Sequence, residues 1–215
     1  MRPVPSRSSE LPLSCPLITP LSDDRSLPHY WNISIEFKLG HSHRVLTPSE
    51  TKAKIADSFA YPIGKSETVT QAKDKDEWYN ALDFGANDHL GEDWNKNSGG
   101  NTDCGEPVFA AANGVITYAE DAGPGWGNVI IIEHTLKNGD KTQTLYGHLQ
   151  EILKTGEVKK RDQIGKVGNA NGRYLCHLHF ELRTADSRDW DKTGGGYAKD
   201  RKGWLDPSDF IDKHR

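Results

Sequence analysis

Near the centre of the chain stands the run Gly127-Asn128-Val129-Ile130-Ile131-Ile132-Glu133-His134. Four aliphatic residues in succession favour a strand that is buried on both faces. The next residues, 137–140, read Lys-Asn-Gly-Asp, and Asn-Gly is the usual signal of a tight hairpin turn. Lys141–Leu149 then provides a partner strand. The sequence therefore predicts an antiparallel hairpin here.

Further short strands are predicted on both sides of this hairpin, each bounded by Gly, Asn or Asp. At the C-terminal end, Asp206 followed by Pro207 is typical of the start of a short helix. This pattern predicts a mainly β fold, an antiparallel sandwich or barrel with a short C-terminal helix. The remaining strands are expected at 107–112, 114–119, 157–160, 163–167 and 176–183.

The N-terminal part of the chain has a different composition. Residues 1–56 begin with a Pro- and Ser-rich stretch and are expected to form a largely disordered or extended tail, with one short strand at 32–37. Residues 57–215 are expected to form the folded domain. Three prolines interrupt the apolar residues between 11 and 21, which makes a poor signal-peptide core, so the export route is left open.

Bulk composition excludes several classes of protein. The 27 basic and 31 acidic residues are interspersed and give a net charge of −4, which does not mark a nucleic-acid binder. The longest aliphatic run, 129–132, is far too short to span a bilayer, so no transmembrane segment is expected. The three cysteines form no CxxC pair, which excludes a thiolate zinc finger.

Histidines carry the strongest functional signal. In Cys176-His177-Leu178-His179-Phe180-Glu181-Leu182, polar and apolar residues alternate, so a strand presents His177, His179 and Glu181 on one face. His89 and Asp93, four residues apart, share a face of a strand or a helix. Catalytic zinc takes three protein ligands, and these two with one histidine of the His-x-His pair would complete such a set. A second His-x-His, at 41–43, lacks apolar neighbours and is taken as accidental.

Taken together, the motifs resemble the lysostaphin-type zinc endopeptidases over about residues 57–212. The matching segments are His89-x-x-x-Asp93, 107–116, 127–134, 145–149, 156–168 and 177–181. The resemblance implies a duplicated hybrid-motif β sandwich. It assigns one Zn²⁺ to His89, Asp93 and His179, and catalytic roles to His148 and His177, although which of the two is the base stays open.

The resemblance also implies a substrate and a place of action. The substrate would be the peptide cross-link or stem peptide of bacterial peptidoglycan, cut by a monomeric, extracytoplasmic enzyme. The long loop between Asp93 and Pro107 departs from the common family pattern, so the resemblance does not define the shape of the groove or the bond that is cut. Cys176 also stands where a Pro or small residue is usual. None of these departures removes a ligand.

Several alternatives remain at this point. Family members that only regulate other wall hydrolases lack metal ligands, whereas all five positions are present here, so a non-catalytic wall-binding module is the alternative function. A biotinyl- or lipoyl-type carrier, suggested by 156–168, would need no zinc set, and a zinc hydrolase with another substrate is a third possibility. Glu181 either orients an imidazole or forms an exposed ion pair. Trp126 either lines the groove or covers the core edge.

Two further expectations concern single residues. Cys104 and Cys176 flank the predicted site, and a disulfide between them, closing the rim of the groove, is a hypothesis. His134 ends a strand and is expected to be structural.

Overall fold

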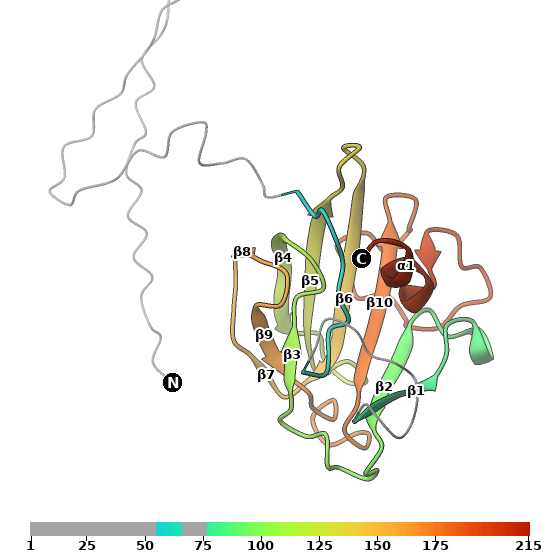
Figure 1. Cartoon of the computed structure of the whole chain (residues 1–215). Coiled ribbons are helices and arrows are strands. Elements are labelled where there is room, and N and C mark those ends of the chain that lie inside the picture. The colour runs from blue at the N-terminus through green and yellow to red at the C-terminus, as the bar shows by residue number, and fades with distance from the viewer. Residues whose placement is uncertain (1–54, 66–76) are drawn as a thin grey trace, which may run out of the picture. The chain divides into compact units, whose positions relative to one another are not determined.

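Two antiparallel sheets build the fold in the computed structural model, which describes residues 55–65 and 77–215 (Figure 1). The larger sheet has the order β1-β2-β10-β6-β5-β4-β8, with β11 added to β10, and the smaller has the order β3-β9-β7. The strands of the larger sheet are β1 (Trp78–Leu82), β2 (Glu92–Lys96), β4 (Gly114–Asp121), β5 (Asn128–Thr135), β6 (Lys141–Leu149), β8 (Glu157–Val158), β10 (Leu178–Thr184) and β11 (Trp204–Leu205).

The smaller sheet and the helices complete the set of elements. Its strands are β3 (Pro107–Phe109), β7 (Glu151–Ile152) and β9 (Gln163–Lys166). A 3-10 turn η1 (Ala86–Asp88) precedes β2, and helix α1 spans Pro207–Lys213 near the C-terminus. Asp206 caps α1 by accepting a hydrogen bond from the Asp209 amide, as its sequence predicts. In the described part of the chain, no helix is long and apolar enough to cross a membrane.

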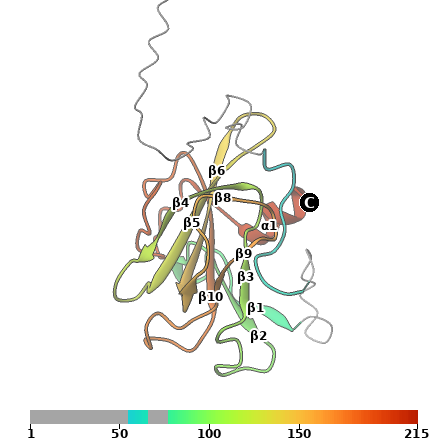
Figure 2. The ribbon, with the colours of Figure 1, turned by 90° about the vertical axis from the view of Figure 1, so that its left-hand side faces the viewer.

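The core lies between the two sheets. Val108 of β3 and Ile164 of β9 join Ile130 and Ile132 of β5 in one buried cluster. Figure 2, turned by 90°, shows β3 and β9 as a layer beside the larger sheet. Burial of these side chains is the main favourable term that holds the two layers together. The predicted β sandwich is confirmed.

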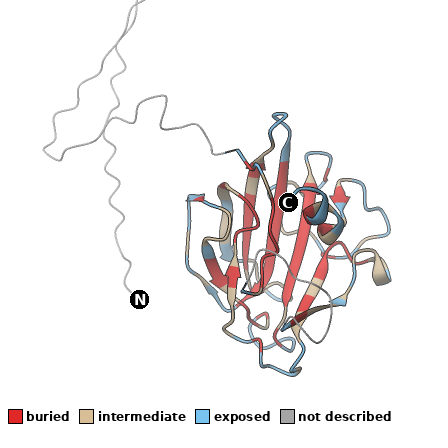
Figure 3. Ribbon diagram, in the orientation of Figure 1, coloured by how far each residue is buried: buried red, intermediate tan, exposed pale blue. Residues whose placement is uncertain are grey.

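Strand β5 is buried on both of its faces, as its aliphatic run predicts. Ile130 and Ile132 face the main core, while Val129 and Ile131 face a second cluster with Leu145. In Figure 3 the buried colouring runs along the central strands of the larger sheet. Such burial places this hairpin at the centre of the fold, with core on both of its faces.

Some strand boundaries in the structure differ from those that the sequence predicts. The predicted strand 107–112 pairs with β9 only as far as Phe109, because the Ala110 amide and carbonyl instead bond to Asp162 and Arg161. Ala56 forms an isolated bridge with Leu136, next to the central hairpin. The predicted tail up to 54, with its strand at 32–37, Cys15 and the second His-x-His, lies outside the described residues.

His134 belongs to a closed hydrogen-bond chain in the core. Its Nδ1 lies 2.8 Å from the Asn113 carbonyl oxygen and its Nε2 lies 2.8 Å from the Thr144 hydroxyl, which lies 2.9 Å from the Tyr146 hydroxyl. The Tyr146 oxygen in turn accepts from the Ala111 amide. The Asn113 carbonyl oxygen only accepts, so the imidazole carries a proton on Nδ1, and both ring nitrogens have partners inside the core. His134 is therefore structural, as expected.

This burial predicts a pH-dependent contribution to stability. Burial lowers the pKa of His134 from 6.5 to about 4, so between these values the unfolded chain binds a proton that the folded chain excludes. The contribution is thus fully present above pH 6.5 and is lost as the pH falls towards 4, by up to about 3 kcal/mol. We expect the difference in unfolding free energy between wild type and His134→Gln to shrink over this range in urea titrations. A constant difference would contradict the assignment.

Candidate metal centre

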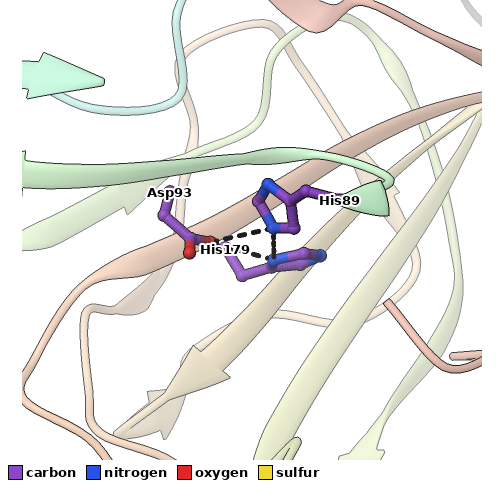
Figure 4. Close-up of side chains that lie close together, drawn as sticks. All are labelled: His89, Asp93 and His179. Carbon is purple, nitrogen blue, oxygen red and sulfur yellow. Dashed lines mark hydrogen bonds and ion pairs between the residues drawn. The ribbon is translucent and has the colours of Figure 1, made fainter. Parts of the chain in front are cut away.

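The pairing of β2 with β10 brings two of the predicted ligands together. In this antiparallel pair Asp93 lies directly opposite His179. His89 precedes β2, at an isolated bridge to Tyr197, and its ring turns back over the same sheet face (Figure 4). On its other side β10 pairs with β6, which aligns His179 with Gly147, the neighbour of His148. Residues about 90 positions apart in the sequence thus meet through strand register.

Three ligand atoms form a tight triangle. His179 Nδ1 lies 3.0 Å from Asp93 Oδ1 and 3.0 Å from His89 Nε2, and the Asp93 oxygen lies 3.3 Å from the His89 nitrogen. Donor atoms around a tetrahedral zinc ion with bonds of about 2.0–2.1 Å are about 3.3 Å apart. Two imidazoles and one carboxylate are also a donor set that catalytic zinc accepts. The residues fit the metal after shifts of a few tenths of an ångström.

Glu181 holds the imidazole of His179 from behind. Its side chain is fully buried, and Glu181 Oε1 accepts a hydrogen bond of 3.0 Å from His179 Nε2. Its other oxygen accepts from Arg183 Nε at 2.7 Å and from Trp204 Nε1 at 2.8 Å. With the proton on Nε2, the Nδ1 lone pair of His179 points at the triangle. Of the two readings left open, the structure supports the orienting role and excludes an exposed ion pair.

These contacts shift the pKa values of Asp93 and His179. Burial raises the pKa of Asp93, but hydrogen bonds with His179 and His89 outweigh it and hold the pKa well below its usual range. Burial lowers the pKa of His179, and its contacts with Asp93 and Glu181 reverse this and raise the pKa to about 9. Without a cation, the raised pKa thus favours the protonated form of His179. A metal ion would supply the positive charge instead.

His148 and His177 lie beside the triangle, with ring centroids 4.7 Å apart. The Trp126 carbonyl lies 3.1 Å from His148 Nδ1, and the Leu175 carbonyl lies 2.9 Å from His177 Nδ1. Carbonyl oxygens only accept, so both rings carry their proton on Nδ1 and keep a lone pair on Nε2. Burial, with the nearby His179 and His177, lowers the pKa of His148 to about 3 and keeps this ring neutral at neutral pH.

The backbone at His148 is unusual. Its φ of 63° lies in the left-handed region, which costs energy for a residue other than glycine. The Trp126 carbonyl also accepts from the His148 amide at 3.0 Å, so one peptide group holds both the main chain and the ring of His148. This double hydrogen bond maintains the strained conformation and fixes the direction of Nε2.

A cavity of about 310 Å³ opens onto these histidines. Trp126 lines it, with its ring against His148 and His179 at centroid distances of 5.8 and 5.2 Å. Trp126 therefore lines the groove. The other lining residues are Asp93, Pro124, Gly125, His148, Tyr174, His177, His179, Gly195, Gly196 and Tyr197.

One side of this cavity is formed by a loop whose position the sequence does not predict. Tyr197 lies over His89, with ring centroids 5.0 Å apart, Gly196 adjoins Trp126, and Gly195 lines the same cavity. These residues lie 15 or more positions beyond His179 in a polar, glycine-rich segment without periodicity. The sequence offers no signal for their position, because the contacts that bring the loop back are tertiary.

A disulfide joins Cys104 to Cys176 across a Cα–Cα distance of 5.2 Å, so this hypothesis is confirmed. Cys176 immediately precedes His177 and β10, and its amide also donates to Asn101 Oδ1 at 2.9 Å. The long loop after β2 is thereby attached to the start of the strand that carries His179.

We expect this bond to protect both thiols and to stabilise the domain. Without reductant, alkylation followed by peptide mapping should label neither Cys104 nor Cys176, and after reduction it should label both. Closing a loop of 72 residues predicts a loss of about 2–4 kcal/mol in unfolding free energy for the double serine variant. Two thiols that react readily before reduction would contradict the pairing.

Known proteins with similar sequences include members of one peptidase family and several lipoproteins. The profile of peptidase family M23 matches residues 88–191. Lipoprotein NlpD of Yersinia enterocolitica is 40% identical over 81 residues, which cover 37% of this chain and 78% of that protein. The murein hydrolase activator NlpD of Escherichia coli (strain K12) is 36% identical over 81 residues, 37% of this chain and 20% of that protein.

Other matches cover less of the relative or are more distant. Cell division protein DipM of Caulobacter vibrioides is 36% identical over 83 residues, 38% of this chain but only 13% of that protein. Among solved structures, the catalytic domain of lysostaphin from Staphylococcus simulans aligns with 74% of this chain and 90% of its own, at 22% identity and a TM-score of 0.42.

Proposed function

Since the chain belongs to peptidase family M23, we propose that it is a zinc-dependent endopeptidase that hydrolyses peptide cross-links or stem peptides of bacterial peptidoglycan. The observation that carries the proposal is the triangle of His89, Asp93 and His179, with ligand atoms 3.0–3.3 Å apart at the edge of a cavity. Two further histidines with available lone pairs adjoin the same cavity.

In this proposal His89, Asp93 and His179 hold one Zn²⁺. Bound there, the ion would polarise the scissile carbonyl and lower the pKa of a coordinated water. The chain's own contribution is to keep the donor set in place. Glu181 fixes the tautomer of His179, and the Arg183 guanidinium, itself fully buried, compensates the charge of Glu181.

His148 and His177 are proposed to move protons. Both rings carry a proton on Nδ1 and a lone pair on Nε2, so either can accept a proton from the attacking water and return it to the leaving amine. Their fixed orientation lowers the cost of arranging these groups during the reaction. Trp126 packs against the ring of His148, and Tyr174 packs against the rings of both His148 and His177.

A second candidate function is activation of other wall hydrolases without catalysis. It is favoured by the 36% identity to a relative named as a murein hydrolase activator. Against it stands the complete donor set, which a purely regulatory module does not require. The two functions predict different behaviour of the purified protein.

The proposed location follows from the proposed substrate. We propose that the chain acts outside the cytoplasm, in the periplasm, the cell envelope or the medium, as a monomer. The Cys104–Cys176 bond supports this location, because disulfides persist in oxidising compartments.

The deciding experiment combines metal analysis with a zymogram on purified peptidoglycan. The peptidase should bind one zinc ion per chain, clear the peptidoglycan band, and lose this activity with a chelator. Mass spectrometry of the soluble products would identify the bond cut. A protein that clears nothing alone, but accelerates an added wall hydrolase, would instead support the activator.

A further inference from the structure

Gly195 stands out among the glycines of the described ranges. Each of the others there either has a positive φ or would bring a Cβ to about 3.0 Å or less from a neighbouring atom. Gly195 has neither feature: its φ is not positive, and a Cβ would meet only the Tyr197 carbonyl, at 3.8 Å. The fold itself therefore gives no reason for glycine at this position.

The segment around Gly195 is held firmly. Trp126 Nε1 donates to the Gly194 carbonyl at 3.0 Å, and the Leu90 amide donates to the Gly196 carbonyl at 2.9 Å. One step earlier, the buried Arg183 donates to the Thr193 carbonyl at 2.8 Å. The carbonyl groups of both neighbours of Gly195 are thus held by hydrogen bonds. A need for a flexible loop therefore does not explain the glycine at this position either.

The space above Gly195 belongs to the cavity at the metal centre. The same cavity is lined by His148, which is 7% exposed and whose Nε2 has no partner within the described part of the chain. None of the described lining residues is Lys or Arg, and Asp93, the only carboxylate, belongs to the triangle. Apart from the residues of the triangle, the described lining thus has no acidic or basic side chain of full charge that could pair with a charged group of a substrate.

We propose that Gly195 is a specificity-determining residue over which the main chain of the substrate peptide lies, and that this cavity takes an uncharged stretch of small residues. The inference rests on the proposed function and names its substrate class. A glycine here lets two main chains approach within van der Waals contact, which a Cβ prevents. The aromatic rings of Trp126 and Tyr197 then pack against the sides of the bound peptide.

The test measures binding separately from hydrolysis. Soluble muropeptides, released from purified peptidoglycan by a muramidase, are titrated into zinc-loaded protein in a His148→Ala background, with and without Gly195→Ala or Gly195→Val. Because a Cβ at 195 has room in the free protein, the melting temperature should not fall. Affinity should decrease about tenfold for alanine and further for valine.

Gly139→Ala is the matched control. It makes the same substitution in the hairpin turn, at a φ of 89° with no atom within 4 Å of the added Cβ. It should lower the melting temperature, because alanine is strained at positive φ, and leave the affinity unchanged. The two glycines thus predict opposite patterns.

The outcomes separate this inference from the proposed function. Unchanged affinity in both Gly195 variants, or no binding of muropeptides by the protein with Gly195, overturns the role of Gly195. If muropeptides that carry a charged residue at every cleavable position bind as tightly as uncharged muropeptides, the proposed substrate class is wrong. Binding that depends on Gly195, without hydrolysis by the wild type, would support the inference while rejecting the peptidase.

Discussion

Replacing His179 with alanine is expected to abolish zinc binding and, with it, hydrolysis of peptidoglycan. His179 is the centre of the site: its Nδ1 is 3.0 Å from both other ligand atoms, and its Nε2 is 3.0 Å from Glu181. Changes to residues that only orient a ligand cost about 10–100-fold in metal affinity, so loss of the ligand itself should exceed this range. The measurement is zinc content after dialysis, by atomic absorption.

Two controls make this result interpretable. His214→Ala removes an exposed histidine near the C-terminus and should retain one zinc ion and full activity. Asp93→Asn removes a second proposed ligand with little change in volume, and should also lose zinc. Because His179 is buried, circular dichroism must show that each variant is folded. A folded His179→Ala protein with normal zinc content would reject the ligand assignment.

Replacing His148 with alanine is expected to retain zinc but reduce turnover by about 10²–10⁴-fold, the usual contribution of a positioned acid or base. This ring contributes no atom to the triangle. Its Nε2 lone pair is available because the Trp126 carbonyl holds Nδ1, and a low pKa of about 3 keeps the ring neutral. The loss should therefore appear in kcat on peptidoglycan fragments, with zinc content unchanged.

Replacing His177 with alanine tests whether His148 and His177 share the proton transfers. His177 adjoins His148 and has the same tautomer, but its Nε2 is also 3.8 Å from Asp93. If the two rings share the proton transfers, both single variants should lose activity and the double variant should lose less than the product of the two effects. Loss of zinc from His148→Ala, or activity within about threefold of wild type, would contradict the assignment to proton transfer.

Much of the fold follows from local sequence. The aliphatic run 129–132 identifies a strand buried on both faces, and the Asn-Gly turn makes it a hairpin, because these signals depend only on neighbours in the chain. The alternation at 176–182 likewise predicts which side chains of β10 face the core and which face the site. The end of β3 at Phe109 could not be predicted, because it depends on hydrogen bonds to residues 161 and 162.

The candidate site also has features that the sequence predicts and features that only the tertiary structure decides. Its donor types, its spacing from His89 to Asp93 and the five residues of interest are visible in the sequence. Strand geometry alone offers both His177 and His179 to the triangle, and only the register of β10 against β2 puts His179 opposite Asp93. The roles of Glu181 and Trp126 were open for the same reason, since burial and contact depend on segments far away in the chain.

What the sequence by itself determined is thus a mainly β domain with histidines and a carboxylate in the order of a zinc peptidase. Alternation and turn signals act over a few residues, and they are readable without a partner. Tertiary structure alone decided the tautomer of His148, the Cys104–Cys176 pairing and the return of Gly195 to the groove. These depend on atoms brought together across 20 to 90 residues, a proximity that only packing and strand register create.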